Sequence, residues 1–278
     1  NDYDHPKQVL AKHAPSLGFV PFIKDRIDIQ FVKHLNFEGI EKADDVTYAF
    51  FRSINRFWFI PFTTHRYIKK QSPQVIIVEG MIFPLQVIFL KLMLGKRVKI
   101  IVQQHNDRPF SGIRGICQRL ADQYIDRYIF TSLQDAQEWV DTKIIRSINK
   151  CNEVLEASTY FQKNDKTASR QKTGVSGTYS FLWVGRLDPV KNPMVVLRAF
   201  QEYLHVNTDA RLYMIYQSGS EINHVEKIIS ENKELKAAVK LVGKIAHDEL
   251  EYWYSAADFY ISGSSREATN YSLLEAMA

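Results

Sequence analysis

The sequence predicts an α/β protein with two parallel α/β units, and three observations support this. Short apolar runs rich in β-branched and aromatic residues alternate with helical patterns through both halves of the chain. The apolar runs are continuous, which is typical of strands buried on both faces of a parallel sheet. The length of 278 residues is about twice that of a common domain, so two domains are expected.

The expected elements follow in order. The predicted strands are Gln74–Glu79, Val98–Gln103, Arg127–Thr131, Tyr179–Gly185, Arg211–Tyr216, Val239–Val242 and Phe259–Ser262. The predicted helices are Lys7–Leu17, Phe83–Leu94, Ile113–Tyr124, Leu133–Val140, Pro193–Val206, Ile222–Asn232 and Asp248–Ala256. The window Val75–Leu94 is long enough to cross a bilayer, but Glu79, Gly80, Pro84 and Lys91 interrupt it. A strand, a turn and a buried helix are therefore predicted there.

A change in composition marks a domain boundary. Residues 162–178 are rich in Lys, Ser, Thr and Gly and carry Val175 as their one large aliphatic residue, which indicates a linker or surface loop. We expect a first domain over 1–158, a linker over 159–178 and a second domain over 179–278. The last helical pattern runs to Ala278, so the second domain is expected to be incomplete.

The segment Asp44–Lys70 is unusually aromatic. It includes Tyr48, Phe50, Phe51, Phe57, Trp58, Phe59 and Phe62. We expect core packing of a long helical region, and an acceptor-binding or membrane-facing surface is the alternative.

Composition and charge narrow the classes of partner. Hydrophobic residues make up 45% and charged residues 24%, which excludes a disordered, collagenous or coiled-coil chain. Residues 1–150 hold 22 Lys and Arg against 15 Asp and Glu, whereas the rest of the chain has a net charge of −2. The basic half favours a phosphate-bearing partner, an anionic membrane surface or simply a solubilising surface. The sequence has no dense basic run with interleaved aromatic residues, so nucleic-acid binding is disfavoured. With two cysteines the chain cannot form a disulfide framework, which favours a reducing compartment, the cytoplasm.

Three loops that follow strands are candidate sites, because ligands of open α/β sheets bind at the carboxyl ends of strands. After the strand ending at Gly185, Arg186 and Lys191 are spaced to bind a pyrophosphate, unless they are ordinary loop cations paired with Asp188. His105 follows the strand Val98–Gln103 and is either a site residue or polar surface.

The third loop begins at Ser264. Glu267 lies in it, and a helix is expected from Thr269 or Asn270, so the backbone amides of Thr269 to Tyr271 would face a phosphate. Glu275 lies in an apolar stretch, and a carboxylate buried there needs hydrogen-bond donors. The hydroxyl groups of a sugar are such donors. Alternatively, Ser272 and Glu275 have the spacing of a capping box.

The segments VGRLDPVKNP (184–193) and SSREATNYSLLEAMA (264–278) together resemble the retaining nucleotide-sugar glycosyltransferases of the GT-B fold, family 4, the glycosyl transferases group 1 type. Glu267 and Glu275 match that family's Glu-x7-Glu motif. The resemblance covers 179–278 most fully, is weaker over 98–160 and is faint before residue 75. It implies two Rossmann-like domains that face a cleft between them, and a hexosyltransferase activity that needs no metal.

The resemblance also implies roles for residues. Arg186 and Lys191, beside Gly185, would bind the donor's diphosphate, and Glu267 would bind hydroxyls of the donor sugar. Glu275 would hold the ribose. The stretch Ala268, Thr269, Asn270 and Tyr271 would meet the phosphates or sugar, and His105 would lie near the transferred sugar. The implied partner is a nucleotide-sugar donor. The basic first half and its aromatic segment favour a glycan or lipid-linked acceptor of cell-surface polysaccharide or glycoconjugate synthesis, at the inner face of the membrane.

The sequence departs from the family pattern in three places. The Gly-rich loop expected after a first strand is replaced by HPKQVLAKH (5–13), and Glu156–Thr159 replace the usual Asn-Gly-Val-Asp. Ala268 and Asn270 stand where glycines are usual, which leaves the identity of the sugar open, and the missing Gly-rich loop leaves acceptor binding unplaced. The sequence does not identify the nucleotide. A non-catalytic nucleotide-sugar-binding or regulatory protein of the same fold is the alternative function. A dinucleotide-dependent oxidoreductase is disfavoured because no G-x-G-x-x-G follows a strand.

Overall fold

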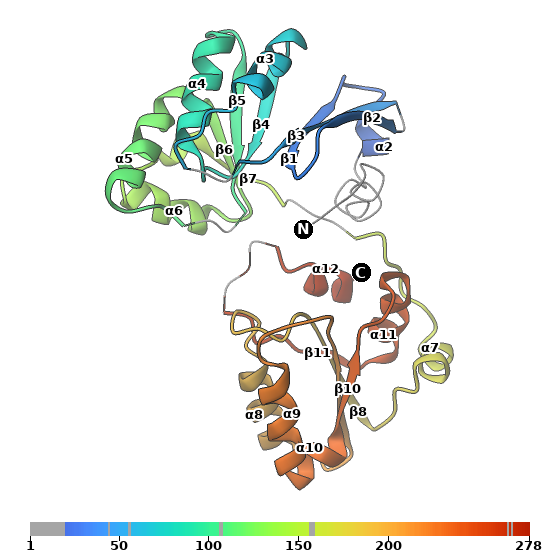
Figure 1. Ribbon diagram of the computed structural model, residues 1–278. Coiled ribbons are helices and arrows are strands. Elements are labelled where there is room, and N and C mark those ends of the chain that lie inside the picture. Colours follow the sequence, from blue (N-terminus) through green and yellow to red (C-terminus); the bar gives the residue numbers. More distant parts are fainter. Residues whose placement is uncertain are drawn as a thin grey trace. The chain divides into compact units, whose positions relative to one another are not determined.

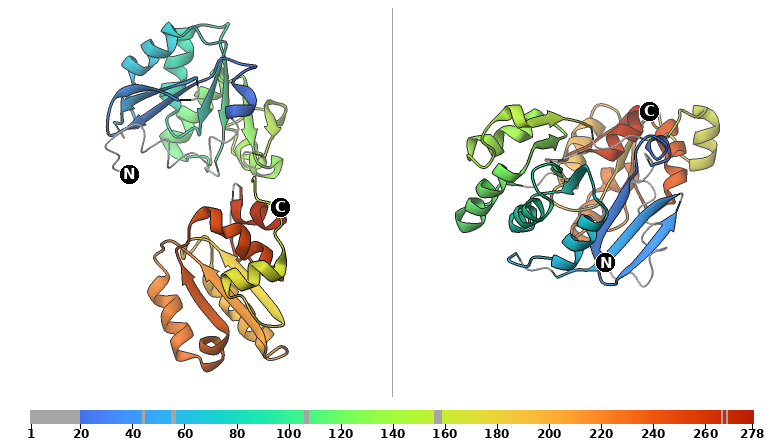
Figure 2. Two further views of the ribbon diagram at one scale, coloured as in Figure 1. Left: turned by 90° about the vertical axis from the view of Figure 1, so that its right-hand side faces the viewer. Right: turned by 90° about the horizontal axis from the view of Figure 1, so that it is seen from above.

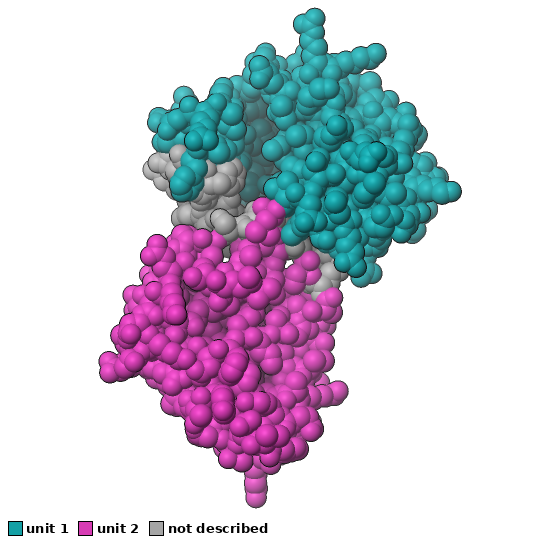
Figure 3. Space-filling view, turned by 180° about the vertical axis from the view of Figure 1, so that it is seen from behind, with its two compact units in different colours: residues 1–154 teal, residues 155–278 magenta. Residues whose placement is uncertain are grey.

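The computed structural model describes residues 20–43, 45–54, 57–105, 108–155, 159–265, 267 and 269–278. The chain divides into two compact units, 1–154 and 155–278 (Figure 3). The helix predicted at Lys7–Leu17 lies outside the described residues.

The first unit contains two sheets (Figure 1). The smaller sheet has the order β1-β3-β2, with β1 parallel and β2 antiparallel to β3; its strands are β1 (Gln30–Leu35), β2 (Gly39–Ala43) and β3 (Val46–Arg52). The larger sheet is parallel and follows the chain order β4 (Val75–Glu79), β5 (Lys99–Gln103), β6 (Arg127–Phe130), β7 (Cys151–Glu153). The helices are α2 (Val20–Ile23), α3 (Phe62–Lys70), α4 (Pro84–Leu94), α5 (Gly112–Ala121) and α6 (Leu133–Asp141), with 3-10 turns η2 (Asp122–Tyr124) and η3 (Ile148–Lys150).

The structure confirms the strand and helix predicted in the apolar window Val75–Leu94, which form β4 and α4. Among the described residues, no helix has both the length and the apolar character that a membrane span requires. The prediction of a long helical region over Asp44–Lys70 was wrong. Its beginning forms strand β3, because Val46, Tyr48 and Phe50 alternate onto one buried face, and the helical part of its described residues is α3.

The second unit is a three-layer α/β structure. Its parallel sheet has the order β10-β9-β8-β11; the strands are β8 (Tyr179–Val184), β9 (Ala210–Ile215), β10 (Val239–Gly243) and β11 (Phe259–Tyr260). The helices are α7 (Lys166–Thr173), α8 (Pro193–Leu204), α9 (Ile222–Glu231), α10 (Lys233–Ala238), α11 (Leu250–Ala256) and α12 (Tyr271–Met277), with the 3-10 turn η4 (His247–Glu249). Figure 2 shows helices on both faces of this sheet.

Alternating residues of the central strands pack into two separate cores. Trp183 of β8 lies in the core formed with α8, α9 and α10, and Met214 of β9 joins it. Their neighbours Leu182 and Tyr213 face the opposite way, into a core with α11. Because both sets are apolar, β8 and β9 read as continuous apolar runs, which explains why the sequence predicts them well.

The segment 159–178 is more ordered than the expected linker. It holds α7, capped by Asp165 and ended by Gly174 in a left-handed conformation (φ 71°). Phe161 and Val175, on either side of α7, are buried in the core that contains α11. This segment, which we expected to be a linker, packs as part of the second unit.

Candidate functional site

The loop between β8 and α8 holds two cations beside one carboxylate. Arg186 Nη2 lies 2.9 Å from Asp188 Oδ2, and the backbone N–H of Lys191 donates to Asp188 Oδ1 (3.1 Å). The Arg186 side chain is 68% exposed, whereas that of Lys191 is 19% exposed. At Gly185, a Cβ would lie 3.3 Å from the Trp183 ring, a tight contact, and 3.6 Å from Lys191 Cδ, an ordinary van der Waals contact.

The loop after β11 lies against this first loop. β8 and β11 are neighbours in the sheet, so their carboxyl ends lie side by side. The backbone N–H of Ser265 donates to Val190 O (2.9 Å). At Gly263, a Cβ would lie 2.8 Å from Asn192 O, so any other residue would push the two loops apart. The two loops are therefore joined by main-chain contacts.

Lys191 and Glu267 meet across these two loops. Lys191 Nζ donates to Glu267 Oε1 at 2.5 Å, and the Glu267 side chain is 23% exposed. The sequence predicted both residues as site residues, and the structure brings them together although 76 positions separate them. With Arg186 and Asp188, they form a compact set of alternating charges at the carboxyl end of the sheet, where an anion or a hydroxyl-bearing ligand could exchange with an internal partner.

Glu275 lies on α12 and is buried, with 9% of the residue exposed. Its two oxygens accept one hydrogen bond each, from His247 Nε2 to Oε1 and from Tyr254 Oη to Oε2, both at 2.9 Å. Burial, followed by the charge of Glu275, raises the pKa of Tyr254 above its ordinary value, so this phenol stays protonated and donates. Sequence reasoning missed His247 and Tyr254.

The start of α12 is capped by Asn270. Asn270 Oδ1 accepts from the backbone N–H of Leu273 (3.3 Å) and from Ser272 Oγ (2.9 Å). The helix start predicted near Thr269 or Asn270 is therefore confirmed, and the alternative capping box of Ser272 and Glu275 was wrong. The amide of Tyr271, expected to face a phosphate, instead donates to Thr269 O (3.1 Å). Thr269 Oγ1 is buried and has no hydrogen-bond partner within the part of the chain that the structure describes.

The remaining predicted residues are placed as follows. His105 lies in the first unit, exposed on the loop after β5. Ala268 lies outside the described residues. The group of predicted residues that the structure brings together thus belongs entirely to the second unit.

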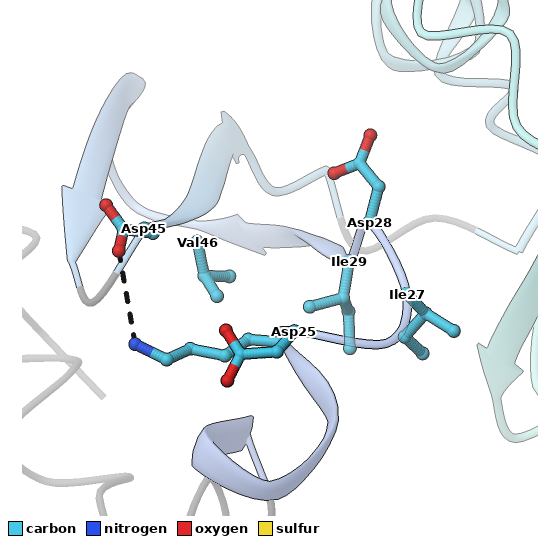
Figure 4. Close-up of a pocket in the computed structure, with 7 residues that line it drawn as sticks. Asp25, Ile27, Asp28, Ile29, Asp45 and Val46 are labelled. Atoms are coloured by element: carbon cyan, nitrogen blue, oxygen red, sulfur yellow. Dashed lines mark ion pairs between the residues drawn. The ribbon is translucent and has the colours of Figure 1, made fainter.

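A small cavity of the first unit lies elsewhere, between the turn after α2 and the start of β3 (Figure 4). Lys24 Nζ lies 4.0 Å from Asp45 Oδ2 at its rim, and the Asp45 side chain is 98% exposed. With a volume of ≈ 60 Å³, it is far below the roughly 300 Å³ of a small-ligand pocket.

Residues 165–278 match the family described as glycosyl transferases group 1. This match spans both loops and both glutamates of the site. A D-inositol 3-phosphate glycosyltransferase from Streptosporangium roseum is 26% identical over 66% of this chain and 44% of its own length. An alpha-monoglucosyldiacylglycerol synthase from Streptococcus pneumoniae is 32% identical over 39% of this chain and 24% of its own length. The chain thus spans less than half the length of these curated relatives.

A sucrose-phosphate synthase from Thermosynechococcus elongatus has the same fold. It superposes on 98% of this chain with a TM-score of 0.68 at 15% identity, and the chain covers 73% of that structure. The fold expectation is therefore confirmed as GT-B, with one Rossmann-like domain in each unit. Within the described ranges, no group of three His, Cys, Asp or Glu side chains is placed to hold a metal ion.

Proposed function

We propose that this chain belongs to a retaining glycosyltransferase of family 4. It moves a hexose from a nucleotide-sugar donor to a glycan or lipid-linked acceptor in cell-surface polysaccharide or glycoconjugate synthesis. The observation that carries the proposal is the contact between Lys191 and Glu267, with the buried Glu275 on the same helix-and-loop segment. The family match over 165–278 supports it.

The donor would bind by displacing the carboxylates that pair with the two cations of the site. Its diphosphate would replace Asp188 and Glu267 as the anion that pairs with Arg186 and Lys191. The released Glu267 carboxylate would accept hydrogen bonds from hydroxyls of the sugar. Glu275 would accept from the ribose hydroxyls, and Thr269 Oγ1 beside the same loop is a buried polar group that no described residue satisfies.

The reaction would break the bond between the sugar C1 and the diphosphate oxygen. Negative charge grows on the leaving diphosphate, and positive character grows on the sugar ring. Lys191 and Arg186 stabilise the leaving group more strongly in the transition state than in the ground state, which is what accelerates a reaction. The acceptor hydroxyl would attack C1 on the same face and pass its proton to a departing phosphate oxygen, with His105 near the transferred sugar.

The two fixed cations perform the charge neutralisation that a divalent metal would otherwise supply, so we propose that transfer is independent of metal. Transfer that persists undiminished in excess chelator is the expected result. Transfer that is abolished by chelator and restored by a divalent cation would contradict this part of the proposal.

The first unit carries an exposed apolar surface on α5, formed by Ile113, Ile116 and Leu120. These residues follow one another at helical spacing, and exposed Arg114 and Arg119 flank them. Apolar side chains bordered by cations fit the interface of an anionic bilayer. We propose that this surface docks a cytoplasmic enzyme on the inner face of the membrane, where a lipid-linked acceptor would be found.

The donor site is tested by ligand-induced stabilisation. A folded sample is heated with UDP, GDP, ADP and their sugar conjugates, since binding to the native state raises the melting temperature. We expect stabilisation by one nucleotide family, and we expect Lys191→Ala to weaken binding of that nucleotide by about 10²-fold or more, because it removes a charge-assisted contact. Lys227→Ala is the matched control, because Lys227 is 68% exposed on α9.

Absence of stabilisation by every nucleotide would contradict the donor site. Donor hydrolysis or transfer separates the enzyme from the alternative, a protein of this fold that binds a nucleotide-sugar without reacting. Selective stabilisation without either reaction, in the presence of lipid-linked and glycan acceptors, would favour that alternative.

A further inference from the structure

We propose that His247 and Tyr254 are positioning residues for Glu275, which hold its carboxylate in the orientation that receives the nucleotide ribose. This assignment rests on the proposed function, because the ligand of Glu275 is the ribose of the donor. Neither residue needs to touch the ligand. Both lie on the segment formed by η4 and α11, whereas Glu275 lies on α12.

The contacts of Glu275 divide evenly between its two oxygens. Oε1 accepts from His247 Nε2 and Oε2 accepts from Tyr254 Oη, each at 2.9 Å. An ionised carboxylate has about four acceptor positions, so these two bonds leave about two positions available. A ribose diol offers two O–H donors, which matches what remains. The two protein bonds thus fix the plane of the carboxylate without exhausting its capacity to accept.

The imidazole of His247 is itself held from the other side. Its Nδ1 lies 3.5 Å from Tyr160 Oη, and its ring lies 5.0 Å from the ring of Phe161. With its proton on Nε2, the imidazole donates to Glu275 and can accept from Tyr160 at once, so the contact with Tyr160 is compatible with the tautomer that Glu275 needs.

Tyr254 is fixed by ring contacts. Its ring centroid lies 6.1 Å from both Phe161 and Tyr260. The hydroxyl group therefore projects from a packed aromatic group, and few rotamers compete with the one that reaches Glu275. Preorganised acceptors bind a ligand more tightly because less conformational freedom is lost on binding.

The experiment compares a ribonucleoside diphosphate with its 2′,3′-dideoxy counterpart by isothermal titration calorimetry. UDP, GDP and ADP and their dideoxy forms are the probes. Wild type is expected to bind the ribo form about tenfold or more tightly than the dideoxy form, since two hydrogen bonds are lost with the diol. Glu275→Gln is expected to remove most of that preference.

Tyr254→Phe keeps the packed ring and removes the hydroxyl. We expect it to weaken binding of the ribo form by about five- to tenfold and to leave binding of the dideoxy form unchanged. His247→Ala should act in the same way, and His247→Gln, whose amide can still donate to Glu275, should recover most of the preference. Tyr252→Phe is the matched control, because it removes a hydroxyl from the same helix, two positions away.

The outcomes separate the two proposals. If Glu275→Gln lowers the preference for ribose but Tyr254→Phe and His247→Ala do not, the positioning role is overturned and the donor site stands. The same holds if these two variants weaken both probes equally, since that is what a merely structural role predicts. A wild-type chain that binds no probe, or that binds ribo and dideoxy forms equally, overturns the proposed function and with it this assignment.

Discussion

The two four-stranded parallel sheets of this chain differ in how they are covered. In the second unit, alternating residues of β8 and β9 enter separate cores on the two faces, and Leu182 and Trp183 are 1% and 2% exposed. In the first unit, Ile100 and Val102 of β5 are fully buried on one face, but Val75 and Ile77 of β4 are 50% and 57% exposed. Both sheets have four parallel strands, but their faces are packed unequally.

The difference in packing indicates which sheet can hold the side chains of the candidate site rigidly. Side chains at the end of a sheet covered on both faces are supported from both sides, and the paired loops around Lys191 and Glu267 extend from such a sheet. The first unit has a net positive charge and an exposed apolar face on α5. Such a surface is better suited to contact with a large partner than to holding single side chains in a fixed geometry.

Truncating one residue in each sheet tests the comparison most strongly. Leu182→Ala should lower the free energy of unfolding by about 2–5 kcal/mol, because it leaves a cavity in a closed core. Ile77→Ala should lower it by less than about 1 kcal/mol, because that side chain is already exposed to solvent. Urea denaturation measures both values, and an unchanged denaturant slope checks that the unfolding transition is the same. Equal losses would mean that the exposed face of β4 is covered in solution.

Each unit has an aspartate just before a strand, and replacing it should lower the free energy of unfolding by less than the loss of a core side chain. Asp126 precedes β6 and accepts from Ile100 N (2.9 Å), and Asp258 precedes β11 and accepts from Ser180 N (2.7 Å). Burial alone would raise the pKa of each carboxyl, but hydrogen bonds from backbone amides and neighbouring side chains, lysines among them, lower it to about 2. We expect Asp258→Ala and Asp126→Ala each to lower the free energy of unfolding by about 2 kcal/mol at pH 7.

The contribution of each aspartate to the free energy of unfolding should depend on pH. Because the folded pKa lies below the ordinary value, the stabilisation is present above about pH 4 and is lost as the pH falls toward 2. The difference between wild type and either variant should therefore shrink over that range. Asp141→Ala, at an exposed position, is the control and should change little. A difference that stays constant down to pH 2 would exclude the carboxylate charge as its cause.

The smallest effect on stability is expected on the exposed surface of α5. Replacing both Ile116 and Leu120 by Ser should change the free energy of unfolding by less than about 1 kcal/mol, yet it should reduce sedimentation with anionic vesicles several-fold. Val206→Ser removes an 80% exposed apolar side chain from the second unit and should leave sedimentation unchanged. Sedimentation that does not depend on anionic lipid content would remove the support for membrane docking.

The predictability of each element follows its local pattern. Strands such as β5 and β8 were predicted because their apolar runs are continuous, and α8 because Pro193 marks its first turn. Strand β3 was missed because Ala49 and Phe51 fill the gaps between its alternating buried residues, which hides the period of two. Strand β7 was missed because it has three residues, of which Cys151 alone is buried.

The candidate site was predictable in its residues but not in its contacts. Lys191, Glu267 and Glu275 follow recognisable motifs. The bonds from His247 of η4 and Tyr254 of α11 to Glu275 of α12 join residues 28 and 21 positions apart, and no local pattern in the sequence encodes them. The spacing of residue types in a motif predicts which side chains bind the ligand. Tertiary packing decides which other side chains hold those ligand-binding groups in position.

The ion pair between Lys191 and Glu267 has a consequence for selectivity. The glutamate pairs with the lysine as an internal competitor, so a ligand that binds the lysine must displace the glutamate. Pyrophosphate alone would satisfy the lysine but leave the glutamate without a partner, and a free sugar would do the reverse. Each unpaired group costs roughly 1–3 kcal/mol. A molecule that carries both an anion and a sugar compensates both groups, so we expect the site to bind a nucleotide-sugar more tightly than the nucleoside diphosphate released from it.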